Sequence, residues 1–98
     1  LEGYFRANQR IHCQIAAASG SATLNEVHDL LFPRTEWARY FALRSLRRWR
    51  ESIGEHREIL EALDLGQAER AGRLMAEHVL HTGQQVVEKL AEAGEEAA

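Results

Sequence analysis

Three of the five histidines in this chain share a predicted helix face with the apolar residues of that helix. They are His12, His56 and His78. Burying three imidazoles in one small core is costly in desolvation unless each ring finds a partner. A divalent cation could partner all three, because neutral imidazole binds zinc, nickel, copper and iron. Taken singly, each ring is more often a hydrogen-bonded core histidine. Because three such histidines occur together, a metal site is supported as well as three hydrogen-bonded core histidines are.

The segment "NQRIH" adds an amide to this set. Asn8 lies four residues before His12, and Phe5, Ile11 and Ile15 follow helical spacing around the pair. Residues four apart lie on one face of a helix, one turn from each other. The side-chain carbonyl of Asn8 could therefore supply an oxygen ligand beside the imidazole. The signal is not a compact motif such as HExxH, since the ligands would come from three separate helices.

The remaining histidines and the cysteine are weaker candidates. We expect His28 and His81 to be surface or hydrogen-bonded residues. Cys13 follows His12 directly and so points about 100° away from it on a helix. We therefore expect Cys13 to be a small buried side chain and not a ligand.

Four helices are expected to position these residues. The predicted ranges are 1–18, 21–44, 48–65 and 67–92. Pro33 should kink or break the second helix, because proline removes a backbone donor and clashes with the preceding turn. Leu24, Val27, Leu31, Ala38 and Ala42 are expected on the inner side of that helix. Gly66 should end the third helix, and short connections favour an all-α antiparallel bundle of four helices.

Composition is ordinary for a soluble globular domain, with 45% hydrophobic and 28% charged residues among 98. No apolar run is long enough for a membrane span. The single cysteine excludes an internal disulfide and is compatible with a reducing cytoplasm. Because the first residue is Leu, we expect the chain to be cut from a longer protein. We treat residues 1–98 as one helical domain.

Six arginines gather in "RTEWARYFALRSLRRWR", together with Trp37, Tyr40 and Trp49. This segment could be a nucleic-acid surface. The plainer interpretation is a solvated helix face whose aromatic side chains pack. The net charge of −3 argues against nucleic-acid binding by the whole chain.

Three segments together resemble the FCD domain, the C-terminal ligand-sensing domain of FadR-type transcription regulators in the GntR family. They are "NQRIHCQIAAASGS", "ESIGEHREILEAL" and "AERAGRLMAEHV". The family pattern has Asp or Asn four residues before a His, then an "EH..I" helix, and then a helix with Met three residues before His. The matching residues, in order and spacing, are Asn8, His12, Glu55, His56, Ile59, Met75 and His78.

The resemblance implies a helical bundle whose interior holds a metal bound by Asn8, His12, His56 and His78. It also implies a small carboxylate effector beside the metal and a winged helix-turn-helix domain upstream. An arginine often occurs in this family near the position of Arg39. That guanidinium could pair with the carboxylate, and Ser52 could add a hydroxyl contact.

The chain departs from the family pattern in three ways. Asn8 stands where Asp is commoner, which removes a negative charge and should weaken metal binding. Ile11 replaces the usual Phe before the histidine and affects only packing. The family's domain begins with one or two further helices, so we expect a truncated FCD domain that lacks them and the DNA-binding domain.

The sequence therefore predicts the effector-sensing domain of a bacterial transcription regulator. We expect a divalent metal, zinc ahead of nickel, manganese or iron, and a small organic acid as effector. The expected protein is a cytoplasmic homodimer that does not bind membranes and contacts DNA only through the absent domain.

Two alternatives stay open. The chain could be a helical module that serves dimerisation alone. It could also be a metal-dependent hydrolase, which would need an open metal position and a general base. Glu55 adjoins His56 in sequence but is rotated away from it on a helix, so the sequence offers no convincing base. We therefore expect no enzymatic activity.

Overall fold

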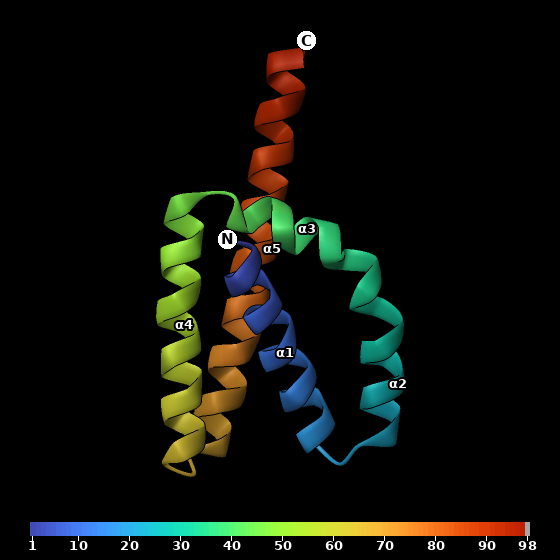
Figure 1. Ribbon diagram of the computed structural model, residues 1–98, viewed down its shortest axis with the longest axis vertical. Coiled ribbons are helices and arrows are strands. Elements are labelled where there is room, and N and C mark those ends of the chain that lie inside the picture. Colours follow the sequence, from blue (N-terminus) through green and yellow to red (C-terminus); the bar gives the residue numbers. More distant parts are fainter. Residues whose placement is uncertain (98) are drawn as a thin grey trace. The chain divides into compact units, whose positions relative to one another are not determined.

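The computed structural model describes residues 1–97, and over that range it contains only helices (Figure 1). The elements are α1 (Glu2–Ala18), α2 (Ala22–Leu31), η1 (Pro33–Thr35), α3 (Glu36–Leu43), α4 (Leu46–Asp64) and α5 (Ala68–Ala97). The all-helical fold predicted from the sequence is confirmed. None of these helices is both long and apolar enough to cross a membrane.

The helix predicted over 21–44 is divided at Pro33. The α2 helix ends at Leu31, η1 is a 3-10 turn, and α3 begins at Glu36. The proline cannot donate to the preceding turn. The Thr35 hydroxyl instead donates to the carbonyl oxygens of Leu31 (3.3 Å) and Phe32 (3.2 Å). The predicted kink or break is therefore confirmed as a break, and the four predicted helices become five α-helices.

The chain comprises two compact units, Leu1–Tyr40 and Phe41–Ala98. In the first unit, α1 and α2 are connected by a short loop at Gly20, which has a φ of +70°. Glycine reaches this left-handed conformation without steric cost. Ser21 then caps α2, because its hydroxyl accepts a hydrogen bond from the Leu24 backbone N–H at 3.1 Å.

Side chains of α1 contact the segment that follows α2 in the same unit. The Phe5 and Tyr40 rings meet edge to face, with centroids 5.2 Å apart. The Gln9 side-chain oxygen accepts from Arg39 Nε at 2.8 Å. These contacts tie α1 to α3, which follows the Pro33 break.

The apolar side of α2 is not a core. Leu24, Val27 and Leu31 are 48%, 47% and 52% exposed. The prediction that they line the inner side of their helix is therefore wrong. Helical spacing identifies residues that share a face, but it does not provide a neighbour to cover that face.

In the second unit, α4 and α5 form an antiparallel pair (Figure 1). They are joined at Gly66, whose φ is +71°. The Gly66 N–H donates to Leu63 O at 3.1 Å, and the Gln67 N–H donates to Ala62 O at 2.8 Å. This arrangement satisfies carbonyls at the end of α4 and reverses the chain. The buried apolar residues of the two helices are Ile59, Ala62, Ala71 and Val86.

Candidate metal centre

The centre of the α4–α5 pair contains two facing histidines. His56 of α4 and His78 of α5 are each 4% exposed, and their Nε2 atoms are 3.1 Å apart. His56 lies four residues after Ser52 and three before Ile59, all on the buried face of α4. That register explains why an imidazole from each helix points into the same space.

The 3.1 Å separation has two chemical interpretations. Two nitrogens bound to one zinc ion at about 2.0–2.1 Å would be about 2.9 Å apart at a right angle and about 3.4 Å apart at a tetrahedral angle. The observed distance lies between these values. It also suits a hydrogen bond in which one Nε2 carries a proton and the other accepts it. The pair can thus act as two cis ligands or as a hydrogen-bonded pair.

Both imidazoles are held in the neutral form that binds metals. Burial, followed by the charge of His78, lowers the pKa of His56 to about 4. Burial also lowers the pKa of His78, although its hydrogen bond to Glu55 opposes this shift. Neutral imidazole offers a lone pair to a metal, whereas the protonated ring does not.

In the first unit, Asn8 and His12 lie one turn apart on α1 and are both buried. Asn8 Oδ1 is a buried oxygen without a hydrogen-bond partner among residues 1–97. Burial removes the water around this oxygen without supplying a hydrogen bond in return. A bound cation is one partner that would supply the missing interaction. His12 lies beside Phe32, with ring centroids 5.8 Å apart.

The three predicted imidazole ligands are His12 in the first unit and His56 and His78 in the second, and histidine is a residue type that can hold a metal ion. The predicted amide ligand, Asn8, presents the unsatisfied oxygen just described. Three imidazole nitrogens and one carbonyl oxygen suit zinc, nickel, iron or manganese. The residues present therefore fit the divalent cation that the sequence predicts.

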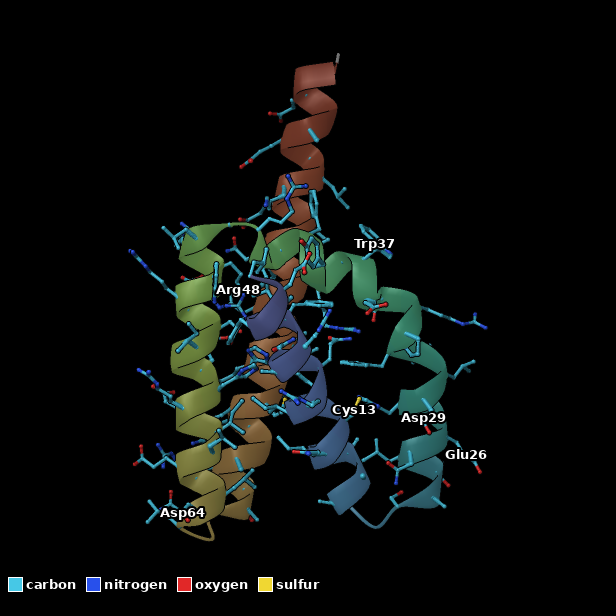
Figure 2. The ribbon with its side chains drawn as sticks, in the orientation of Figure 1. Cys13, Glu26, Asp29, Trp37, Arg48 and Asp64 are labelled. Carbon is cyan, nitrogen blue, oxygen red and sulfur yellow. The ribbon has the colours of Figure 1, made fainter. Side chains whose placement is uncertain are left out.

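A network around Glu55 was missed by the sequence reasoning. Its Oε1 accepts from His78 Nδ1 at 2.6 Å and from Arg48 Nη2 at 2.7 Å. Its Oε2 lies 2.9 Å from both Arg48 Nη1 and His81 Nδ1. Glu55 is indeed rotated away from His56, as expected, but that rotation directs it at the second histidine of the pair. Figure 2 labels Arg48 beside α4.

These contacts set the charge state of Glu55. Burial alone would raise the pKa of this carboxyl, but hydrogen bonds from Arg48, His78 and His81 outweigh burial and lower the pKa to about 2. A carboxylate of such low basicity, already bonded to three donors, is a poor general base. The hydrolase alternative therefore gains no catalytic group from it.

A signal for this network was present in the sequence. Arg48, Ser52 and Glu55 follow an i, i+4, i+7 spacing, which is a helix stripe, and His81 follows His78 by three residues. Arg48 is completely buried. A fully buried arginine requires a partner, so it does not belong to a solvated or nucleic-acid-binding face.

The two predicted effector contacts occupy different settings. Ser52 is buried on α4, one turn before His56. Arg39 donates to Gln9, to Thr35 Oγ1 (2.6 Å) and to Phe32 O (2.7 Å), and its guanidinium carbon lies 3.4 Å from the Phe32 ring centroid. Burial lowers the pKa of Arg39 to about 10, so it stays charged at neutral pH.

The remaining candidates are peripheral. His28 stacks on Phe32 with ring centroids 4.6 Å apart, and His81 is bonded to Glu55, so both satisfy the expectation of surface or hydrogen-bonded histidines. Cys13 is exposed, and the prediction that it is buried is wrong. Because Cys13 follows the buried His12 directly, its side chain points about 100° away from that residue on α1.

Comparison with known proteins identifies the family of this chain. The family model of the FCD domain matches residues 1–81. No curated protein and no solved structure matches the chain. FCD domains are regulatory ligand-binding domains and not catalytic ones. Together with the helical fold, the match shows that this chain belongs to the FCD family, the C-terminal domain of GntR/FadR-type regulators.

Proposed function

We propose that this chain is the effector-sensing domain of a transcription regulator and binds one divalent cation through Asn8, His12, His56 and His78. The observation that carries the proposal is the buried pair of Nε2 atoms 3.1 Å apart, a spacing suited to two ligands of one ion. The unsatisfied oxygen of Asn8 supports an added oxygen ligand.

Zinc is the first choice of metal, with nickel, manganese and iron as alternatives. Three neutral imidazoles and an amide carry no negative charge, so the ion keeps its full positive charge at the site. An anionic ligand in a remaining coordination position would be stabilised by that charge. This electrostatic argument favours a small organic acid as the effector.

Arg39 and Ser52 are the proposed effector contacts. Three of the five N–H groups of Arg39 have partners among residues 1–97, and its charge is retained at neutral pH. A guanidinium with remaining donors can bind a carboxylate. The Ser52 hydroxyl would add a polar contact on the His56 side of the site.

In the intact regulator, the effector would alter DNA binding through a winged helix-turn-helix domain. The regulator would be cytoplasmic. It would act as a homodimer, because the two-fold symmetry of a dimer matches a palindromic operator. The effector would shift the population between two placements of the DNA-binding domains only if it binds one of them better.

Metal analysis tests this function directly. Protein purified without chelators should contain about one equivalent of divalent metal, and His56→Ala should lose most of it. His28→Ala is the matched control, since His28 stacks on Phe32 outside the proposed ligand set. Equal stoichiometric metal in the parent and His56→Ala would remove His56 from the site. Absence of metal from the parent, even after zinc addition, would leave dimerisation as the remaining role.

Calorimetry tests the effector. Di- and tricarboxylates should bind to the metal-loaded protein and bind much more weakly after metal removal. Arg39→Gln should weaken that binding without changing the metal content. Carboxylate binding that is unaffected by metal removal would contradict the proposed coordination.

A further inference from the structure

His78 has two ring nitrogens with different surroundings. Its Nε2 faces His56 Nε2 at 3.1 Å, and its Nδ1 lies 2.6 Å from Glu55 Oε1. The two nitrogens point in different directions from the ring. One can therefore bind a cation while the other is held by the carboxylate.

The position of the Nδ1 proton follows from the neighbouring groups. Arg48 donates to both oxygens of Glu55, which is the pairing of an ionised carboxylate, and such a group can only accept hydrogen bonds. If Nδ1 of His78 lacked a proton, two lone pairs would face each other across 2.6 Å. Arg48 Nη2 is also near Nδ1, but at 3.4 Å, and its shorter bond goes to Glu55 at 2.7 Å. The arrangement therefore favours a proton on Nδ1 and a lone pair on Nε2.

Glu55 is itself held in place. Arg48 binds both carboxylate oxygens, at 2.7 and 2.9 Å, in the parallel geometry that fixes a carboxylate most firmly. Arg48 is completely buried and also donates to Thr82 Oγ1 at 2.8 Å. The chain of contacts runs from Arg48 through Glu55 to His78, within the α4–α5 pair.

We propose that Glu55 is a positioning residue that fixes the orientation and tautomer of His78, so that Nε2 presents its lone pair to the cation. This inference rests on the proposed function. A carboxylate behind a metal-binding histidine orients the ring and increases its basicity, and its loss typically reduces metal affinity 10- to 100-fold. Arg48 supports the carboxylate without approaching the ligand atom.

The proposal also predicts that the position of the proton on the His56 ring changes when a metal binds. In the metal-free protein, His78 Nε2 is an acceptor, so His56 Nε2 carries the proton between the rings. A cation bound between the rings would take the place of that proton, which would leave to solvent while Nδ1 of His56 takes one up, so that the ring stays neutral and both Nε2 atoms are ligands. His78 should keep one tautomer throughout, whereas the proton of His56 should move from Nε2 to Nδ1.

Zinc affinity of charge-removing variants is the first test. Glu55→Gln should bind zinc at least 10-fold more weakly than the parent in a competition titration. Glu58→Gln is the matched control, because Glu58 lies on the same helix and lines the same 260 Å³ cavity as Glu55 and His78. It should bind zinc like the parent. Parent-like affinity in Glu55→Gln would overturn this inference and leave the proposed function intact.

The tautomer provides a second test that needs no substitution. Histidine ¹⁵N spectra of the metal-free parent should show His78 with its proton on Nδ1 and His56 with its proton on Nε2. This measurement decides the question if Glu55→Gln fails to fold. A proton on Nε2 of His78 would overturn the inference. A parent that binds no zinc would overturn the proposed function together with it.

Discussion

Asn8 is the ligand candidate whose chemistry is the least ordinary for this family. Its buried oxygen lacks a hydrogen-bond partner among residues 1–97, and it stands where the family pattern more often has Asp. An amide avoids placing a charge in a buried site when no cation is present. It also offers less electrostatic attraction to a cation than a carboxylate would.

We predict that Asn8→Asp binds zinc at least 10-fold more tightly than the parent. The same variant should be less stable without metal, by about 1–3 kcal/mol, because its carboxylate is then buried without a partner. Zinc competition and chemical denaturation in chelator would measure the two effects. An affinity equal to that of the parent would show that the side chain of residue 8 does not reach the ion.

Acid should destabilise the metal-free protein in two steps. The folded-state pKa of His56 is about 4, below its ordinary value of 6.5, so the unfolded chain binds the proton first as pH falls. The same reasoning applies to Glu55 at lower pH, because folding lowers the pKa of its carboxyl from 4.5 to about 2. In both windows the unfolded state holds more protons, so the free energy of unfolding must decrease with falling pH.

The expected loss from His56 is roughly 2–3 kcal/mol between pH 6.5 and 4. Denaturation in chelator at a series of pH values would measure it. His56→Gln should flatten this part of the curve while leaving the decline below pH 4.5 that belongs to Glu55. A parent that is equally stable at pH 7 and pH 4 would contradict the buried, neutral state of His56.

At the residue scale, the four ligand candidates could be proposed from the sequence because each follows a regular helical spacing. The Glu55 network left only the spacing of Arg48, Ser52 and Glu55 in the sequence, because its partners lie on the neighbouring helix. One helix shows that Glu55 and His56 point in different directions. Only the pairing of α4 with α5 shows that Glu55 then meets His78 and His81.

The α4–α5 turn is the element that sets His56 against His78. We predict that Gly66→Ala destabilises the protein by about 1 kcal/mol, because a φ of +71° is unfavourable for a residue with a Cβ atom. Thermal denaturation of the metal-free protein would measure this change. Zinc affinity should fall only slightly, since the hydrogen bonds of the turn can persist.

Gly54→Ala is the control for that substitution. Gly54 lies inside α4, and a Cβ atom placed there meets nothing within 4 Å. Alanine in a helix interior should raise stability by about 0.5–1 kcal/mol. Similar effects of the two substitutions would mean that the turn does not require its left-handed residue.

Helix boundaries were predictable where one residue forces them. Pro33 breaks its helix and Gly66 ends another, each through a backbone property of a single residue type. The start of α4 was predicted two residues late because the capping role of Ser45 was not recognised; its hydroxyl accepts from Arg48 N at 3.3 Å. Burial was less predictable, as Leu24 and Val27 demonstrate, because it depends on what lies opposite.

For the molecule as a whole, we predict that this chain alone does not bind DNA with sequence specificity. The net charge is −3, and the match to the regulatory domain spans residues 1–81. Arg48, near the end of the arginine-rich segment, is buried beside Glu55 and cannot reach a phosphate. A mobility-shift assay at moderate salt would test this, with the full regulator as positive control. Sequence-specific retardation at nanomolar concentration would overturn the assignment to sensing.

The length of α5 would carry a movement at the proposed metal site to a distant part of the second unit. This helix has 30 residues and no proline, and α4 has only 19, so α5 extends beyond its partner (Figure 1). From His78 to Ala97 the helix rises about 28 Å at 1.5 Å per residue. A 5° tilt pivoting at His78 would therefore displace the far end by about 2.5 Å. A small movement of one imidazole toward an ion would thus become a larger displacement at the far end of α5. That displacement would be large enough to repack a side chain.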